Sequence, residues 1–205
     1  GLTVMAIHNH YPQAAVMTGL PDESFIRADI PMTKREIRAS VVSRLSPAKD
    51  AIVYDIGAGT GSVSVELAMH ALYGTVYAVE RTKEGCELIA QNARKFGLDN
   101  IDIINASAAD VIEKLPAADS VFIGGSGGEL EKIMDIVLKK NPGVHIVITA
   151  VTLETLNDSV RLMEDKKVDV IDIVQIAVTQ IKKRGRYHML AANNPVFIIE
   201  GRGNR

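Results

Sequence analysis

The stretch DIGAGTGSVSVELA, residues 55–68, joins an apolar strand to an apolar helix through a turn with three alternate glycines, Gly57, Gly59 and Gly61. The residues AIVYDIG before the turn are typical of a buried strand, and SVSVELAMHAL after it has apolar residues at helical spacing. Glycine permits positive φ and lets a ligand approach the backbone closely. This order predicts an α/β fold with a ligand site beyond the carboxyl end of the strand.

The rest of the chain continues the alternation of strands and helices. Further strands are expected at residues 74–80, 100–105, 119–125 and 144–151, each followed by a helical pattern. Such alternation implies right-handed crossovers and a parallel sheet. The last two expected strands, residues 168–183 and 194–202, have no helix between them, so they predict a closing antiparallel hairpin with a basic loop. We therefore expect a Rossmann-like, seven-stranded, mostly parallel sheet with a C-terminal antiparallel hairpin.

Composition restricts the classes of protein. The 205 residues are 47% hydrophobic, which suits one domain with a substantial core. A net charge of −2 does not favour a polyanionic partner, and the apolar runs are too short to span a membrane. Cys86 is the single cysteine, so a reducing cytoplasm is expected, and we see no signal peptide. Residues 1–18 are expected to be a tail or the remnant of a preceding domain, and residues 19–205 the functional domain.

The ligand of the glycine turn is inferred from its spacing and charge. The spacing G-x-G-x-G is one residue shorter than the dinucleotide fingerprint, and Asp55 before it would repel phosphates. A carboxylate there suits the ammonium group of S-adenosylmethionine, whose own carboxylate would meet backbone N–H groups. Glu80, at the end of the next strand, can accept hydrogen bonds from both ribose hydroxyls. The alternative is a tight turn without a ligand and a solvated glutamate.

The base of that cofactor is expected after the third strand. Backbone groups of Ser107 and Ala108 would meet the purine edge, and Asp110 would either accept from the purine amino group or cap the following helix. The fourth strand leads into FIGGSGGEL, residues 122–130. Its small residues predict a floor for a large flat substrate, or else a flexible loop; they are Gly124, Gly125, Ser126, Gly127 and Gly128.

Two basic groups are candidates for an anionic ligand. Arg27, Lys34 and Arg35 precede the first strand, and KKRGR, residues 182–186, lies between the last two strands. A solvated loop is the alternative for the second group. The histidines have no metal-ligand spacing, so no metal site is predicted; four of them are His8, His10, His70 and His145.

Six motifs together resemble one family, and they cover roughly residues 19–201. They are GLPDESFIRADIPMTKREIR, DIGAGTGSVSVE, VYAVER, FIGGSGGELE, TAVTLETL and YHMLAANNPVFII. The chain is similar to the small subunit or C-terminal domain of the precorrin-6Y C5,15-methyltransferases (decarboxylating), also called cobalt-precorrin-6B C15-methyltransferases (decarboxylating). These are class I S-adenosylmethionine-dependent methyltransferases of cobalamin biosynthesis.

The resemblance implies a function. The expected reaction methylates carbon 15 of a modified tetrapyrrole and removes carbon dioxide from the acetate at carbon 12. It also implies a homotetramer and a carbon-5 methyltransferase as a fused or separate partner. For this reaction Thr33, the expected cap of the first helix, would contact the methionine end of the cofactor, and Lys34 the substrate. Tyr187 and His188 are the candidate proton donors.

The sequence departs from the family pattern at the base site. The acid that the family has after the third strand is replaced by Ser107 or Ala108, which leaves the adenine contact open. Other readings of the fold are a tRNA or RNA adenine methyltransferase, a non-catalytic cofactor-binding domain and a nicotinamide dehydrogenase. The net charge argues against the first, the complete glycine turn with Glu80 against the second, and the glycine spacing against the third.

Overall fold

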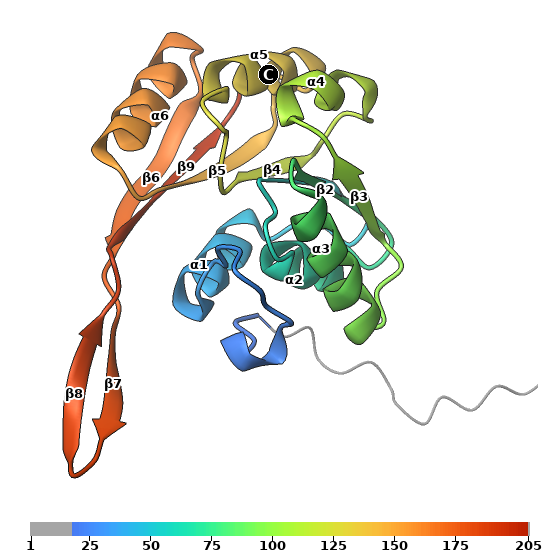
Figure 1. Ribbon diagram of the computed structural model, residues 1–205. Coiled ribbons are helices and arrows are strands. Elements are labelled where there is room, and N and C mark those ends of the chain that lie inside the picture. The colour runs from blue at the N-terminus through green and yellow to red at the C-terminus, as the bar shows by residue number, and fades with distance from the viewer. Residues whose placement is uncertain (1–17, 205) are drawn as a thin grey trace, which may run out of the picture.

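A computed structural model describes residues 18–204 of the protein. A seven-stranded sheet has the order β3-β2-β1-β4-β5-β9-β6 and carries helices on both faces (Figure 1). Strands β1 to β5 are parallel, and β9 is antiparallel to both β5 and β6. The strands are β1 (Ile52–Ile56), β2 (Thr75–Glu80), β3 (Ile101–Asn105), β4 (Ser120–Ile123), β5 (His145–Ala150), β6 (Asp169–Ile176) and β9 (Val196–Arg202). The predicted fold class is confirmed.

Helices α1, α2 and α3 cover one face of the sheet, and α4, α5 and α6 cover the other (Figure 1). Their bounds are α1 (Arg35–Leu45), α2 (Ser62–His70), α3 (Lys83–Lys95), α4 (Ala108–Val111), α5 (Leu130–Lys140) and α6 (Leu153–Asp165), with 3₁₀ turns η1 (Asp22–Ser24) and η2 (Ile112–Lys114). None of the helices within residues 18–204 has the length and apolar composition that a membrane crossing requires.

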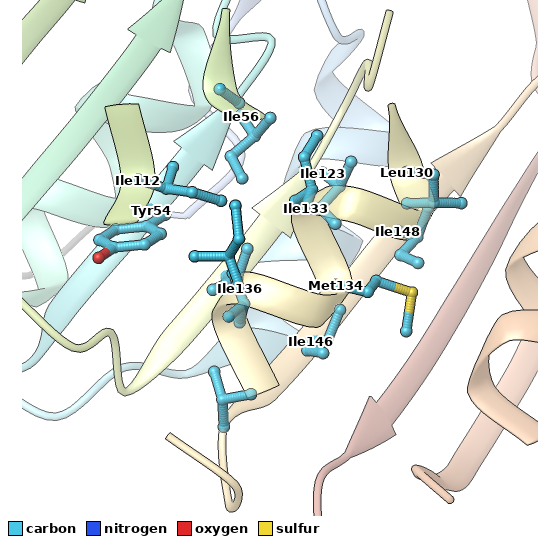
Figure 2. Close-up of a cluster of buried hydrophobic side chains, with 14 of the residues drawn as sticks. Tyr54, Ile56, Ile112, Ile123, Leu130, Ile133, Met134, Ile136, Ile146 and Ile148 are labelled. Atoms are coloured by element: carbon cyan, nitrogen blue, oxygen red, sulfur yellow. The ribbon is translucent and has the colours of Figure 1, made fainter. Parts of the chain in front are cut away.

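The core lies on both faces of the central strands. Val53 of β1 packs toward α1 and α2, whereas its neighbours Tyr54 and Ile56 belong to the cluster beneath α5. Side chains alternate between the faces of a strand, so a strand covered on both sides is apolar throughout. Figure 2 shows this cluster, in which Ile133 and Met134 of α5 lie against the strands. The packing holds the loops at the carboxyl ends of the strands in place.

The closing hairpin differs from the expected one. Residues 168–183 form two strands rather than one: β6 pairs with β9, and β7 (Thr179–Arg184) pairs with β8 (Tyr187–Ala192). The β7–β8 pair is a separate sheet that projects from the molecule as an arm (Figure 1). The expected basic loop is thus mostly strand β7, and the turn consists of Gly185 and Arg186. Side chains alternate between the two faces in both β6 and β7, so the sequence pattern does not reveal where the chain leaves the main sheet.

A buried ion pair anchors the segment before α1. The guanidinium Nε of Arg38 lies 2.6 Å from Oε1 of Glu66, and both side chains are fully buried. Glu66 also accepts from the N–H groups of Gly19 and Leu20, at 2.8 and 3.0 Å. Arg38 Nη1 donates to the carbonyl of Thr33 at 2.7 Å. These contacts fix residues 19–33 against α1 and α2.

The start of α1 also differs from expectation. Its N-cap residue is Lys34, which makes no side-chain cap hydrogen bond, so Thr33 does not cap the helix. The expected tail, residues 1–18, lies outside the described residues except for Thr18, as do His8 and His10. Within residues 18–204 no group of three or more His, Cys, Asp or Glu side chains could hold a metal ion.

Candidate functional site

A cavity of about 650 Å³ opens at the carboxyl ends of β1, β2, β3 and β4. This is where the strand order reverses direction between β1 and β4, the position at which open α/β sheets bind ligands. Five segments line the cavity. They contribute Ile56, Gly57 and Gly59; residues 79–82 and Glu84; residues 106–108; residues 124–127 and Glu129; and residues 29–31.

The glycine turn brings three of these segments together. Gly57 and Gly59 have φ of +74° and +56°. A Cβ atom on Gly59 would lie 2.9 Å from the carbonyl oxygen of Pro31, so a side chain would displace the anchored segment. Gly61 has a different role. It does not line the cavity, and a Cβ atom on Gly61 would lie 3.0 Å from the side chain of Ile89 in α3. Two of the three glycines therefore face the cavity, and the third permits α2 to pack on α3.

Glu80 is held in position by the protein itself. Its Oε2 accepts from the N–H of Gly59 at 3.0 Å, and its Oε1 accepts from the N–H and hydroxyl of Thr82 at 2.9 and 2.8 Å. The side chain faces the cavity and is otherwise buried. Each carboxylate oxygen has more than one lone pair, so Glu80 can accept further hydrogen bonds from a ligand.

Asp55 lies beneath the turn rather than in the cavity wall. It is fully buried; its Oδ2 accepts from the hydroxyl of Ser64, and its Oδ1 has no hydrogen-bond partner. Burial raises the pKa of Asp55 to about 7, with a smaller contribution from the charge of Glu80, against the hydrogen bond from Ser64. An unpartnered buried oxygen is costly, so it favours a donor that arrives with a ligand. Contact with an ammonium group stays a prediction.

The site after β3 contains a carboxylate that sequence reasoning missed. Ser107 and Ala108 line the cavity as expected, and the Ser107 hydroxyl donates to Oε2 of Glu129 from the loop before α5. Asp110 does not cap α4. It is outside the cavity wall, its side chain is exposed, and its Oδ1 lies 3.5 Å from Lys132 Nζ. The N-cap of α4 is Ser107. Glu129 follows the small residues of FIGGSGGEL, yet no local pattern separates it from an ordinary helix-start acid.

The loop after β4 is hydrogen-bonded to the end of β1. The N–H groups of Gly124 and Gly125 donate to the carbonyl of Ile56 at 2.9 and 3.3 Å. Gly127, with φ of +61°, lies against Arg81, since a Cβ there would be 3.1 Å from the Arg81 Nη1. Residues 124–127, including Ser126, thus form a bare surface in the cavity wall.

Comparison with known proteins agrees with this geometry. A sequence model of the family described as "Precorrin methyltransferase domain" matches residues 24–201. The chain belongs to this family.

Three relatives show how far the similarity extends. A Pyrobaculum calidifontis protein named "Probable cobalt-precorrin-6B C(15)-methyltransferase (decarboxylating)" is 40% identical over 184 residues, 88% of this chain and 94% of the relative. The structure of precorrin-6y C5,15-methyltransferase from Geobacter metallireducens is 37% identical with a TM-score of 0.85, over 93% and 100% of the two chains. That of precorrin 8W decarboxylase from Methanobacterium thermoautotrophicum is 33% identical with a TM-score of 0.83, over 89% and 98%.

Several residues expected in the methyltransferase site lie apart from its cavity. Thr33 is outside the cavity wall, where its carbonyl serves Arg38. Lys34 lines a second, shallower hollow of about 520 Å³ with Arg27. The two cavities adjoin because residues 30–31 line both. Tyr187 and His188 are on the exposed arm and line neither cavity.

The charge of the methyltransferase cavity is negative. Four carboxyl side chains and one guanidinium line it; they are Asp29, Glu80, Glu84, Glu129 and Arg81. Such a wall attracts a cationic ligand and repels phosphates. A dinucleotide, which carries two phosphates, therefore does not suit this cavity.

Proposed function

We propose that this chain methylates carbon 15 of a precorrin or cobalt-precorrin with S-adenosylmethionine, and removes carbon dioxide from the acetate at carbon 12, as a step of cobalamin biosynthesis. Membership of the precorrin methyltransferase domain family carries the proposal, and it is supported by the names of the relatives, which include both the C15-methyltransferase activity and its decarboxylation. The cavity at the switch point of the sheet supports the use of a sulfonium cofactor.

The residues of the cavity fit S-adenosylmethionine. The backbone at Gly57 and Gly59 would hold its carboxylate, and Glu80 its ribose hydroxyls. The free Oδ1 of Asp55, buried beneath the turn, would bind its ammonium group through a bridging water. With a sulfonium, an ammonium and one carboxylate, the cofactor has a net positive charge that matches the acidic wall. The backbone of residues 107–108 would contact the base. When bound, the cofactor supplies an electrophilic methyl group.

The chain contributes alignment and exclusion of water. The attacking carbon belongs to an electron-rich macrocycle, so the protein needs no strong general base, and fixed orientation in an enclosed site supplies most of the rate increase. Residues 124–127 offer a bare surface that a flat macrocycle can approach, and residues 29–31 lie over the glycine turn. The electron pair released by decarboxylation passes into the conjugated ring. Arg27 and Lys34, beside the cavity, would bind carboxylates of the substrate.

We further propose that the chain forms a homotetramer in the cytoplasm. The arm and strand β6 expose large apolar side chains, which favour burial against another copy; they are Ile181, Tyr187, Met189 and Leu190 on the arm, and Val170, Ile171 and Ile173 on β6. A proton-donor role for Tyr187 or His188 requires that the arm of a second copy reaches the cavity. The carbon-5 methyltransferase, fused or separate, stays the predicted partner.

The test uses the purified chain, S-adenosylmethionine with a labelled methyl group, and precorrin-6B-type substrates with and without cobalt. Mass spectrometry of the product is expected to reveal the gain of one methyl group and the loss of carbon dioxide. Gly59→Val, which fills the turn, is expected to abolish both changes. Label that enters tRNA in a parallel reaction but not the tetrapyrrole would overturn the proposal.

A further inference from the structure

We propose that Glu129 is the carboxylate that recognises the exocyclic amino group of the cofactor's adenine, with Ser107 as the residue that positions it. The inference rests on the proposed use of S-adenosylmethionine and names the residue that selects its base. Ser107 or Ala108 occupies the position after β3 at which the family pattern has an acid. The carboxylate comes instead from the loop that follows β4.

The order of the strands places the base at this end of the cavity. The glycine turn follows β1, Glu80 ends β2, and Ser107 follows β3. The carbonyl of Glu80 accepts from the N–H of Ala106 at 3.2 Å and from Nδ2 of Asn105 at 3.1 Å, which ties the ends of β2 and β3 together. In a nucleoside the base is attached at C1′ of the ribose and the 5′ substituent at C4′, on the two carbons that flank the ring oxygen, so they extend from different ends of the sugar. With the methionine part at β1 and the ribose at Glu80, the base lies beside Ser107.

The Glu129 carboxylate is directed to that place. Glu129 is the N-cap residue of α5, but its side chain makes no cap hydrogen bond. Instead its Oε2 accepts from the Ser107 hydroxyl, across a separation of 22 residues. Both residues line the cavity. The next residue, Leu130, is buried in the cluster under α5 (Figure 2), so the backbone that carries Glu129 is held firmly.

The chemistry of the pair matches adenine. A carboxylate held by one donor keeps lone pairs for a second, and the 6-amino group of adenine is a donor. Lys132 Nζ lies 4.0 Å from Oε1 of Glu129, on the next turn of the same helix. A 6-oxo purine presents an acceptor at the same position, so it would face the carboxylate without a hydrogen bond and be rejected.

The experiment measures binding by calorimetry, with S-adenosylhomocysteine and its deaminated counterpart S-inosylhomocysteine as the probes. Wild-type protein is expected to prefer the adenine compound about tenfold or more, the range for a lost bond to a charged group. Glu129→Gln is expected to weaken binding of S-adenosylhomocysteine about tenfold and leave S-inosylhomocysteine unchanged or tighter, because an amide can donate to the 6-oxo group. Unchanged binding of the second probe also establishes that the variant is folded.

Two further variants separate recognition from structure. Ser107→Ala is expected to reduce the preference for adenine, and Ser107→Thr, which keeps the hydroxyl, to restore it. Glu131→Gln is the matched control, since Glu131 lies on the same helix with an exposed side chain outside the cavity wall. Its preference should equal that of the wild type. If Glu129→Gln keeps the full preference while binding S-adenosylhomocysteine tightly, the role of Glu129 is overturned and the proposed function stands. If wild-type protein binds neither probe, both fail.

Discussion

Gly57 and Gly125 lie so close that a Cβ atom on Gly57 would be 2.6 Å from the carbonyl oxygen of Gly125. The turn after β1 and the loop after β4 therefore touch through their backbones. Both loops follow neighbouring parallel strands, and they diverge on opposite sides of the sheet beyond this contact. Both glycines line the cavity, so the contact lies in the wall where the cofactor and the substrate are expected to meet.

Gly57→Ala is expected to separate these loops. The variant should weaken binding of S-adenosylhomocysteine at least about tenfold and lower the free energy of unfolding by about 1–3 kcal/mol, because the backbone is strained and displaced. Calorimetry and urea unfolding measure the two effects. Gly97→Ala is the control, since Gly97 also has positive φ but no neighbour within 4 Å of a Cβ. A similar loss of affinity in both variants would argue against the contact.

Glu80→Ala is expected to weaken binding of S-adenosylmethionine at least about tenfold, since it removes the acceptor for the ribose hydroxyls and frees the N–H of Gly59. Glu84→Ala removes another acid of the cavity wall that is exposed, and it is expected to change the affinity less than about threefold. Calorimetry compares the two variants. Equal effects would mean that Glu80 acts only through the charge of the cavity.

Asp55 makes stability depend on pH. Its pKa in the folded protein is about 7, above the ordinary value of 3.8, because burial disfavours the charged form. The folded state thus holds a proton that the unfolded chain releases, so this contribution to stability is complete below about pH 4 and is lost as pH rises through 7. Asp55→Asn, which stays neutral, is expected to unfold at a less pH-dependent temperature between pH 5 and 8. Thermal unfolding across this range measures the difference.

The same variant distinguishes stability from binding. At pH 8 Asp55→Asn is expected to be at least as stable as the wild type, but to bind S-adenosylmethionine less tightly, since an amide does not pair with the ammonium group. Wild-type affinity should rise between pH 6 and 8 as Asp55 ionises. An affinity that is unchanged by the substitution at both pH values would remove Asp55 from the site.

Glu66→Ala is expected to release the segment over the glycine turn. Removal of one partner of a buried ion pair costs up to about 3–5 kcal/mol. Here the buried Nε of Arg38 loses its acceptor, while Nη1 keeps its contact with Asp22 at 3.2 Å. The amides of Gly19 and Leu20, which donate to Glu66, are expected to exchange with solvent faster than in the wild type. Glu113→Ala breaks an exposed pair with Lys139 and should change stability by less than about 1 kcal/mol. Protected Gly19 and Leu20 amides in Glu66→Ala would contradict this anchoring.

The arm is expected to be necessary for assembly. Leu190→Asp places a charge on an exposed apolar position of β8 and should reduce the molar mass in light scattering to that of a smaller species. The sheet should stay folded, because β7 and β8 pair only with each other among the described strands. Gln180→Asp, an exposed polar position on β7, is the control. An unchanged mass in Leu190→Asp would place the interface elsewhere.

Local patterns in the sequence were sufficient for the fold class, and they placed several expected site residues in the wall of one cavity. A glycine turn between an apolar strand and an apolar helix has few structural solutions, so the α/β fold was predicted correctly. Gly57, Gly59 and Glu80 line the cavity, and their contacts with a cofactor stay predictions. These features depend on residues that are close in the chain. Gly97 likewise has positive φ just after the end of α3, where a helix commonly ends on glycine.

Features that depend on distant residues appeared only in the folded chain. Thr33 and Asp110 have suitable chemistry, yet packing of residues 19–33 and of α4 turns them away from the cavity. Glu129 meets Ser107 because β4 and β3 lie on opposite sides of β1 and β2, and their loops close over the same end of the sheet. The arm lies between β6 and β9 in the chain, which pair at the edge of the main sheet, whereas β7 and β8 pair only with each other among the described strands. The sequence by itself determines which side chains are available. The order of the strands and the packing of the helices determine which of these side chains lie in the same cavity.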